Sequence, residues 1–83
     1  MTNPVILQLR MNLAENQKDF NECEIKIKRL FWELQNLINP YYKGIDEIKA
    51  EEIEQSADEL LRTKQKAKKL FDEINSIKSQ LGE

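Results

Sequence analysis

The stretch LFWELQNLINPYYKG, residues 30–44, decides how this chain folds, because a long apolar repeat ends inside it and a turn begins. Proline lacks a backbone N–H and disfavours helical geometry in the residue before it, so Asn39-Pro40 predicts the end of a helix. Tyr41, Tyr42, Lys43 and Gly44 then provide a connection. The chain is expected to change direction here, between one helix and the next.

Upstream of this turn, apolar residues recur with the seven-residue spacing of a coiled-coil helix. The positions that repeat at alternate spacings of three and four residues form one seam, and all of them except Asn16 are apolar. They are Ile6, Leu9, Leu13, Asn16, Phe20, Cys23, Ile27, Leu30, Leu34 and Leu37. Asn3-Pro4 supplies a start, since asparagine caps free N–H groups and proline suits the first helical position. A helix is predicted over about residues 4–39.

Downstream of the turn, a second repeat of seven is present. One row contains Ile53, Leu60, Ala67, Ile74 and Leu81, and a neighbouring row contains Ala50, Ala57, Lys64, Phe71 and Lys78. Asp46 is a candidate cap, and acidic residues crowd the first turns, where the helix dipole favours them. We predict a turn over about residues 40–46 and a helix over about 47–81. The fold class is therefore all-α, a single antiparallel, coiled-coil-like hairpin.

The similar lengths of the two helices also predict which residues meet. If the chain folds back near Lys43-Gly44, the numbers of facing residues add to about 87. This register sets Phe20, the bulkiest residue of its row, against Ala67, the smallest of the matching row. It also places Lys64 opposite Cys23, so that Lys64 and Asn16 interrupt the apolar seam and are expected to fix register and partner number.

The apolar stripe is wider than one partner helix covers. This width predicts self-association, and a homodimer of hairpins forming a four-helix bundle is the simplest closed arrangement. An unidentified protein partner would cover the same surface. The candidate core and oligomer residues are Phe20, Ile27, Phe31, Leu34, Ile38, Leu60, Leu70, Phe71, Ile74 and Ile77.

The composition of these 83 residues argues against catalysis. Histidine is missing, and with it the commonest general base and metal ligand. The single cysteine, Cys23, occupies a seam position and is expected to pack as a small apolar residue. The acidic residues are expected to form solvated faces, and the glycines form no phosphate-binding loop. We expect no enzyme activity, no metal and no cofactor.

The sequence pattern and the net charge also predict where the protein is located and which classes of partner it attracts. The start MTNPVILQLR lacks the pattern of a secretory leader, and no apolar run reaches the roughly 18–20 residues that span a bilayer. A cytoplasmic location without membrane association is expected. The net charge of -2 provides no global attraction to nucleic acid.

Two local surfaces are candidates for function. Trp32, Tyr41 and Tyr42 lie near the turn and form either a partner contact or a cap over the end of the core. The stretch RTKQKAKK, with nearby basic residues of the first helix, could contact nucleic-acid phosphates, although acidic residues stand close and no aromatic residue interleaves it. Its candidate contacts are Lys26, Lys28, Arg29, Arg62, Lys66, Lys68 and Lys69.

The leading functional prediction is a non-catalytic protein–protein interaction, adaptor or chaperone-like module that self-associates. The alternative is a dimeric hairpin that binds nucleic acid through the basic stretch. A third possibility is an assembly subunit of a larger complex, for which periodicity provides no separate signal.

Overall fold

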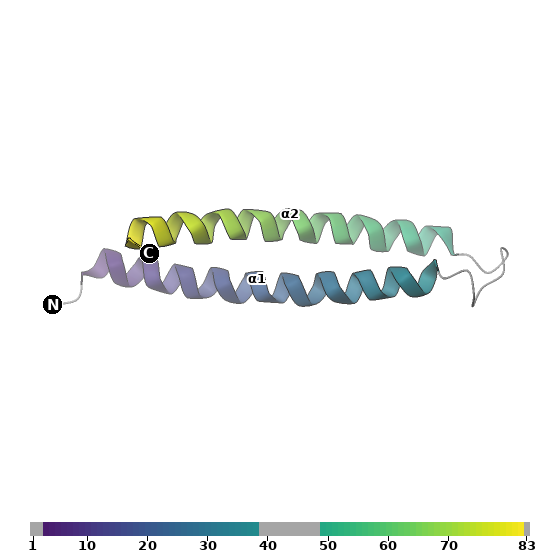
Figure 1. The fold of residues 1–83 in the computed structure, drawn as a ribbon, viewed down its shortest axis with the longest axis horizontal. Helices are drawn as coiled ribbons and strands as arrows, with labels where there is room; N and C mark the ends of the chain where they lie inside the picture. The colour runs from purple at the N-terminus through teal and green to yellow at the C-terminus, as the bar shows by residue number, and fades with distance from the viewer. Residues whose placement is uncertain (1–2, 39–48, 83) are drawn as a thin grey trace.

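A computed structural model describes residues 3–38 and 49–82, which form two α-helices and no strand. α1 spans Pro4–Leu37 and α2 spans Ala50–Leu81. The helices run antiparallel, so the beginning of α1 and the end of α2 lie at one end of the molecule, called here the open end (Figure 1). Two helices packed against each other confirm the predicted all-α hairpin.

The first helix begins as its sequence predicts. Asn3 Oδ1 accepts a hydrogen bond from the backbone N–H of Val5 at 2.9 Å, and Pro4 holds the first helical position. This contact satisfies one of the N–H groups that a helix start leaves free. At the other end, Leu37 is the last helical residue, and Ile38 leaves helical geometry with φ -105° and ψ 5°.

The second helix begins at Ala50, three residues later than the predicted range. Lys49 holds the cap position without a side-chain cap hydrogen bond, and Glu51 and Glu52 lie in the first turn, where the dipole favours negative charge. The predicted turn over about residues 40–46 and the predicted cap, Asp46, lie outside the described residues. Gly82 ends the helix at φ 80°, a left-handed conformation that glycine adopts without steric cost, and its N–H donates to the carbonyl of Ser79 at 3.1 Å.

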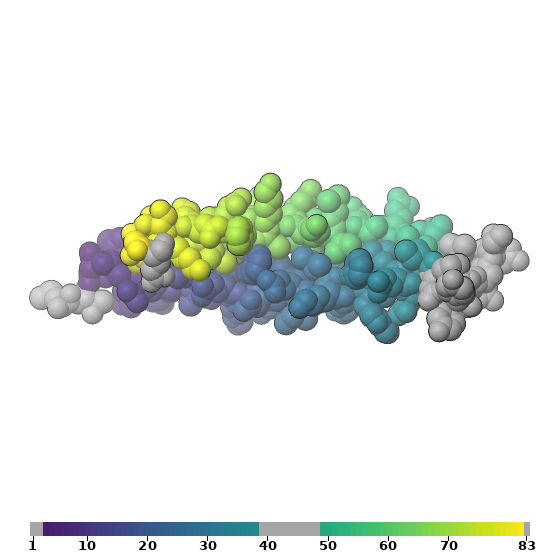
Figure 2. Space-filling view, in the orientation of Figure 1, coloured from purple at the N-terminus to yellow at the C-terminus, as the bar shows by residue number. Residues whose placement is uncertain are grey.

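The core is a narrow seam between the helices, along which their side chains touch (Figure 2). Leu30 is its most buried residue, with 1% of its surface exposed. Near the middle of the hairpin, Cys23, Ala67 and Leu70 form a buried cluster, and the half-buried Phe20 and Ile27 pack against it. Phe20 therefore contacts the cluster that holds its predicted partner, Ala67.

The register between the helices lies close to the predicted one. Lys26 pairs with Glu59, and the rings of Phe20 and Phe71 are neighbours. The predicted register sets Lys26 against Leu61 and Phe20 against Ala67. The observed partner of Lys26 comes slightly before Leu61 in α2, and that of Phe20 comes slightly after Ala67, each within about one helical turn. A shift by a whole heptad is therefore excluded.

The second seam row of α2 differs from the prediction, which placed Lys64 there. Thr63 and Leu70 are buried and Ile77 is half-buried, whereas Lys64 and Phe71 are exposed. The row of Thr63 and the row of Lys64 lie on either side of the row that begins at Ile53. The row of Thr63 faces α1, because the alternative would bury the ammonium of Lys64. The Thr63 hydroxyl donates to the carbonyl of Glu59 at 2.8 Å, so this polar group is satisfied inside its own helix. The prediction that Lys64 interrupts the seam opposite Cys23 is therefore wrong.

The hairpin is a slender rod, with principal extents of 67 × 16 × 15 Å. A single seam leaves two long edges and two outer faces in contact with solvent. Within residues 3–38 and 49–82, a site is therefore a surface that lies along the helices.

Candidate interaction surface

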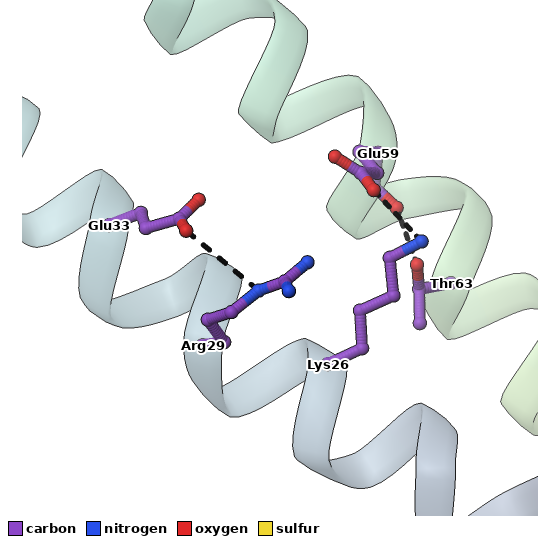
Figure 3. A network of polar contacts seen from close by, with 5 residues as sticks. All are labelled: Lys26, Arg29, Glu33, Glu59 and Thr63. Carbon is purple, nitrogen blue, oxygen red and sulfur yellow. Dashed lines mark hydrogen bonds and ion pairs between the residues drawn. The ribbon is translucent and has the colours of Figure 1, made fainter.

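One edge of the hairpin is polar and internally paired (Figure 3). Lys26 Nζ of α1 lies 2.8 Å from Glu59 Oε1 of α2, and Arg29 Nε lies 3.8 Å from Glu33 Oε1 one turn further along α1. These four residues define the polar edge, and the hydroxyl of Thr63 lies beneath it. Its positive and negative groups already contact each other.

The charge of Glu59 is stabilised by this arrangement. The hydrogen bond from Lys26 and then the positive charge of the same ammonium hold the pKa of Glu59 below its usual value, more strongly than partial desolvation raises it. Arg29 and Arg62 lower the pKa further by their charge. The carboxylate is thus ionised and partnered near neutral pH, which suits a structural link between helices.

The opposite edge is apolar in the half that lies away from the open end. Lys26 comes directly before the seam residue Ile27, and Phe31 comes directly after the seam residue Leu30. Lys26 and Phe31 therefore lie on opposite sides of the seam. Phe31 is 56% exposed, and Ile38, seven residues later, is 57% exposed. We call this row, with the facing residues of α2, the apolar edge; its members are Phe31, Ile38, Ala50, Ala57 and Leu61.

The α2 side of the apolar edge consists mainly of small residues. Ala50 and Ala57 are exposed and lie seven residues apart, and Leu61 is one turn beyond Ala57. The sequence pattern assigns both alanines to the row next to that of Ile53, where they would share the seam, whereas the structure exposes them. Their seven-residue spacing was the signal for this edge, but spacing alone does not tell which side of the seam a row occupies.

Towards the open end, the same side of the hairpin becomes mixed. The rings of Phe20 and Phe71 lie 6.1 Å apart between centroids, with an interplanar angle of 39°, and Phe71 remains half in solvent. Glu24 of α1 and Lys64 of α2 are exposed and take part in none of the ion pairs formed within residues 3–38 and 49–82. They mark the boundary of the apolar edge.

The ten predicted core and oligomer residues separate by exposure. Leu70 and Ile74 are buried in the seam, and Phe31, Ile38 and Phe71 are exposed beside it. The half-buried members are Phe20, Ile27, Leu34, Leu60 and Ile77.

The predicted aromatic contact is described only at Trp32. This side chain is 64% exposed and lies one position beyond Phe31, on the face of α1 turned away from α2. Tyr41 and Tyr42 lie outside the described residues. Trp32 shares its outer face with Ile25, seven residues earlier and also exposed.

The basic candidates do not form one uninterrupted patch. Lys26, Arg29 and Arg62 each contact a carboxylate, the last pairing with Asp58 one turn earlier. Lys28 lies two residues after Lys26, which places it on the other side of α1. A shallow depression on α2 is lined by Arg62, Gln65, Lys66, Lys68 and Lys69, without an acidic side chain.

Across residues 3–38 and 49–82, no three acidic or cysteine side chains are grouped so that they could hold a metal ion. Neither α1 nor α2, as far as the structure describes them, is long and apolar enough to cross a membrane.

Comparison of the chain with known protein families, with curated proteins and with solved structures finds no match.

Proposed function

We propose that this chain is a non-catalytic interaction module, a helical hairpin that self-associates and serves as an adaptor or chaperone-like unit. The observation that carries the proposal is the apolar edge, where Phe31 and Ile38 each leave more than half of their surface in water. Exposed apolar surface costs about 25 cal/mol for each Å² that a partner could cover. A second copy of the chain removes this cost most simply.

The small size of the core supports the same proposal. A single seam of two helices buries few side chains completely, and a chain of 83 residues lies near the lower limit for independent stability. Association would add a second layer of packing. The hairpin would then be the subunit of a four-helix bundle, and its lone cysteine would remain a reduced thiol in the cytoplasm.

Light scattering during gel filtration tests self-association. The expected mass is that of two chains at micromolar concentration, and Phe31→Gln combined with Ile38→Gln should shift it toward one chain. Ile25→Gln is the matched control, because Ile25 is exposed on the outer face of α1 and lies away from the apolar edge. A wild-type protein that remains monomeric would refute the proposal.

Nucleic-acid binding is the second candidate, and the depression formed by Arg62, Lys66, Lys68 and Lys69 favours it. Such a site predicts affinity for single- or double-stranded probes that falls steeply with salt. Lys66→Glu, Lys68→Glu and Lys69→Glu together should abolish it, while Lys18→Glu on the outer face of α1 should have little effect. Absence of salt-sensitive binding near physiological ionic strength would exclude this function.

A further inference from the structure

We infer that two copies of this chain dock through their apolar edges with their open ends together, related by a twofold axis parallel to the helices. This inference rests on the proposed self-association and adds the surface and the orientation. A twofold axis of this direction places α1 of one copy beside α2 of the other. The four helices then alternate in direction around the bundle.

The sizes of the side chains favour this orientation. Phe31 and Ile38 project from α1, whereas Ala50 and Ala57 occupy the same length of the edge on α2. With α1 beside α2 of the second copy, Phe31 meets Ala57 of that copy and Ile38 meets Ala50, so large residues enter spaces left by small ones. The symmetry makes each of these contacts occur twice.

The competing twofold axis, which crosses the helices, pairs like with like. It places α1 over α1 of the second copy and α2 over α2, with the open ends at opposite ends of the dimer. When the halves away from the open ends overlap, Phe31 and Ile38 meet the same bulky residues, while Ala50 and Ala57 meet one another. Bulky residues then hold the layers apart and the alanine side remains underpacked, which is the weaker arrangement.

The charges along the same side provide a second, independent argument. Glu24 and Lys64 lie at matching heights on α1 and α2, exposed and outside the ion pairs described above. In the same-end dimer, Glu24 faces Lys64 of the second copy, and Lys64 faces Glu24, so two complementary pairs form at the border of the apolar contact. In the opposite-end dimer, Glu24 lies away from Lys64 of the second copy.

The contact is strongest in the half of the hairpin that lies away from the open end. At the open end, Arg10 and Lys78 occupy this side of the hairpin, and a same-end dimer brings them close to Lys78 and Arg10 of the second copy. Like charges repel there, so we expect the open ends to remain hydrated. The polar edge and Trp32 stay on the outside of the bundle, where a different protein could bind them.

Distances between spin labels test the orientation. Labels are attached to Asn36→Cys far from the open end, or to Glu15→Cys towards the open end, each in a Cys23→Ala background; both sites are exposed and away from the apolar edge. A same-end dimer predicts about 20–30 Å between equivalent labels at both sites, from helix spacings of 8–10 Å and the label arms. An opposite-end dimer separates at least one pair by about 30 Å along the axis alone.

The outcomes separate this inference from the proposed function. Two short distances together with a two-chain mass support it. A two-chain mass with one long distance overturns the orientation but leaves self-association standing, whereas a one-chain mass overturns both. A larger assembly would overturn the closed dimer of hairpins.

Charge exchange provides a test that needs no label. Homodimers of Glu24→Lys or of Lys64→Glu place like charges together and should dissociate about tenfold more readily, within the range of coupling for neighbouring residues. Mixing the two variants should restore pairing as a heterodimer, because opposite charges face each other again. The mixture of Glu22→Lys and Lys66→Glu is the control, with the same change of net charge at exposed positions away from the edge. If both mixtures pair equally, the assigned contact is refuted.

Discussion

Lys26 Nζ of α1 lies 2.8 Å from Glu59 Oε1 of α2, and this is the ion pair that joins the two helices within residues 3–38 and 49–82. The other pairs in these ranges connect residues three or four positions apart in one helix. Lys26 therefore contributes to the alignment of the helices, while its apolar neighbours supply the burial. Exposed pairs of this kind are worth little individually, so its clearest signature is a dependence on pH.

We predict that Glu59→Gln destabilises the hairpin at neutral pH and that the difference from wild type disappears in acid. The pKa of Glu59 is lower in the folded chain than in the unfolded chain, mainly because Lys26 donates a hydrogen bond to its carboxylate. Its contribution to stability is therefore fully present above the unfolded pKa and is lost as the pH falls through the folded pKa. Urea unfolding followed by circular dichroism, from neutral pH downwards, measures the difference.

The control for this pH effect is Glu15→Gln, which changes an exposed carboxylate outside the ion pairs of the described residues. Its unfolding free energy should differ little from that of wild type at neutral pH, because no ion pair is lost. If the Glu59→Gln difference persists after the carboxylates are protonated, the ion pair is not its cause.

We predict that Leu30→Ala lowers the free energy of unfolding far more than Ile25→Ala. Leu30 is almost fully buried between the helices, and removal of a buried leucine typically costs about 2–5 kcal/mol. Ile25 belongs to the same helix but faces solvent, so its truncation should cost under about 1 kcal/mol. Urea unfolding at one fixed protein concentration checks both values, since association would make stability depend on concentration. Similar losses would contradict the seam described for α1.

We also predict that Thr63→Lys is strongly destabilising, whereas Lys64→Thr is nearly neutral. Thr63 is 7% exposed and its hydroxyl bonds within α2, so a lysine there must either bury its ammonium or displace α1. Lys64 lies in solvent on the neighbouring row. A loss of about 2–4 kcal/mol for the first variant and under about 0.5 kcal/mol for the second is expected by thermal or urea unfolding. The reverse ranking would restore the row that the sequence pattern favoured.

How much of this architecture was predictable depends on how strongly the residues constrain each side of a helix. In α1, apolar residues at the seam positions alternate with polar ones, so the burial of Leu30 and Cys23 follows from periodicity. In α2, the row of Ala57 and Phe71 holds at least as many apolar residues as the row of Thr63 and Leu70, so periodicity does not choose between them. The choice follows from the lysines of the first row, whose ammonium groups would have to be buried if that row faced α1.

The candidate surface was only partly predictable for a related physical reason. Exposure of Phe31 and Ile38 follows from a stripe wider than one helix covers, which the sequence reveals. The pairing of Lys26 with Glu59 depends on the lateral offset between helices and on long flexible side chains, neither of which periodicity determines. The side of the hairpin occupied by Ala57 requires the three-dimensional packing as well.

Phe20 contacts the cluster of Cys23, Ala67 and Leu70. The final prediction concerns the exchange of Phe20 with Ala67, a large residue with a small one. Phe20→Ala removes a half-buried ring and should cost about 2–3 kcal/mol, and Ala67→Phe overpacks a buried site by about 1–3 kcal/mol. In the double variant, the new ring can occupy the space that Phe20 leaves. The double variant should therefore be more stable than the sum of the two losses implies, by about 1–2 kcal/mol.

Denaturant unfolding of the four species, wild type, each single variant and the double variant, measures this coupling. A matched pair is Phe20→Ala with Ala14→Phe, since Ala14 is exposed on α1 and cannot refill the site near Ala67. That pair should show additive losses. Additive losses in the Phe20 and Ala67 pair as well would mean that these residues do not share a packing site, and the register between α1 and α2 would have to change.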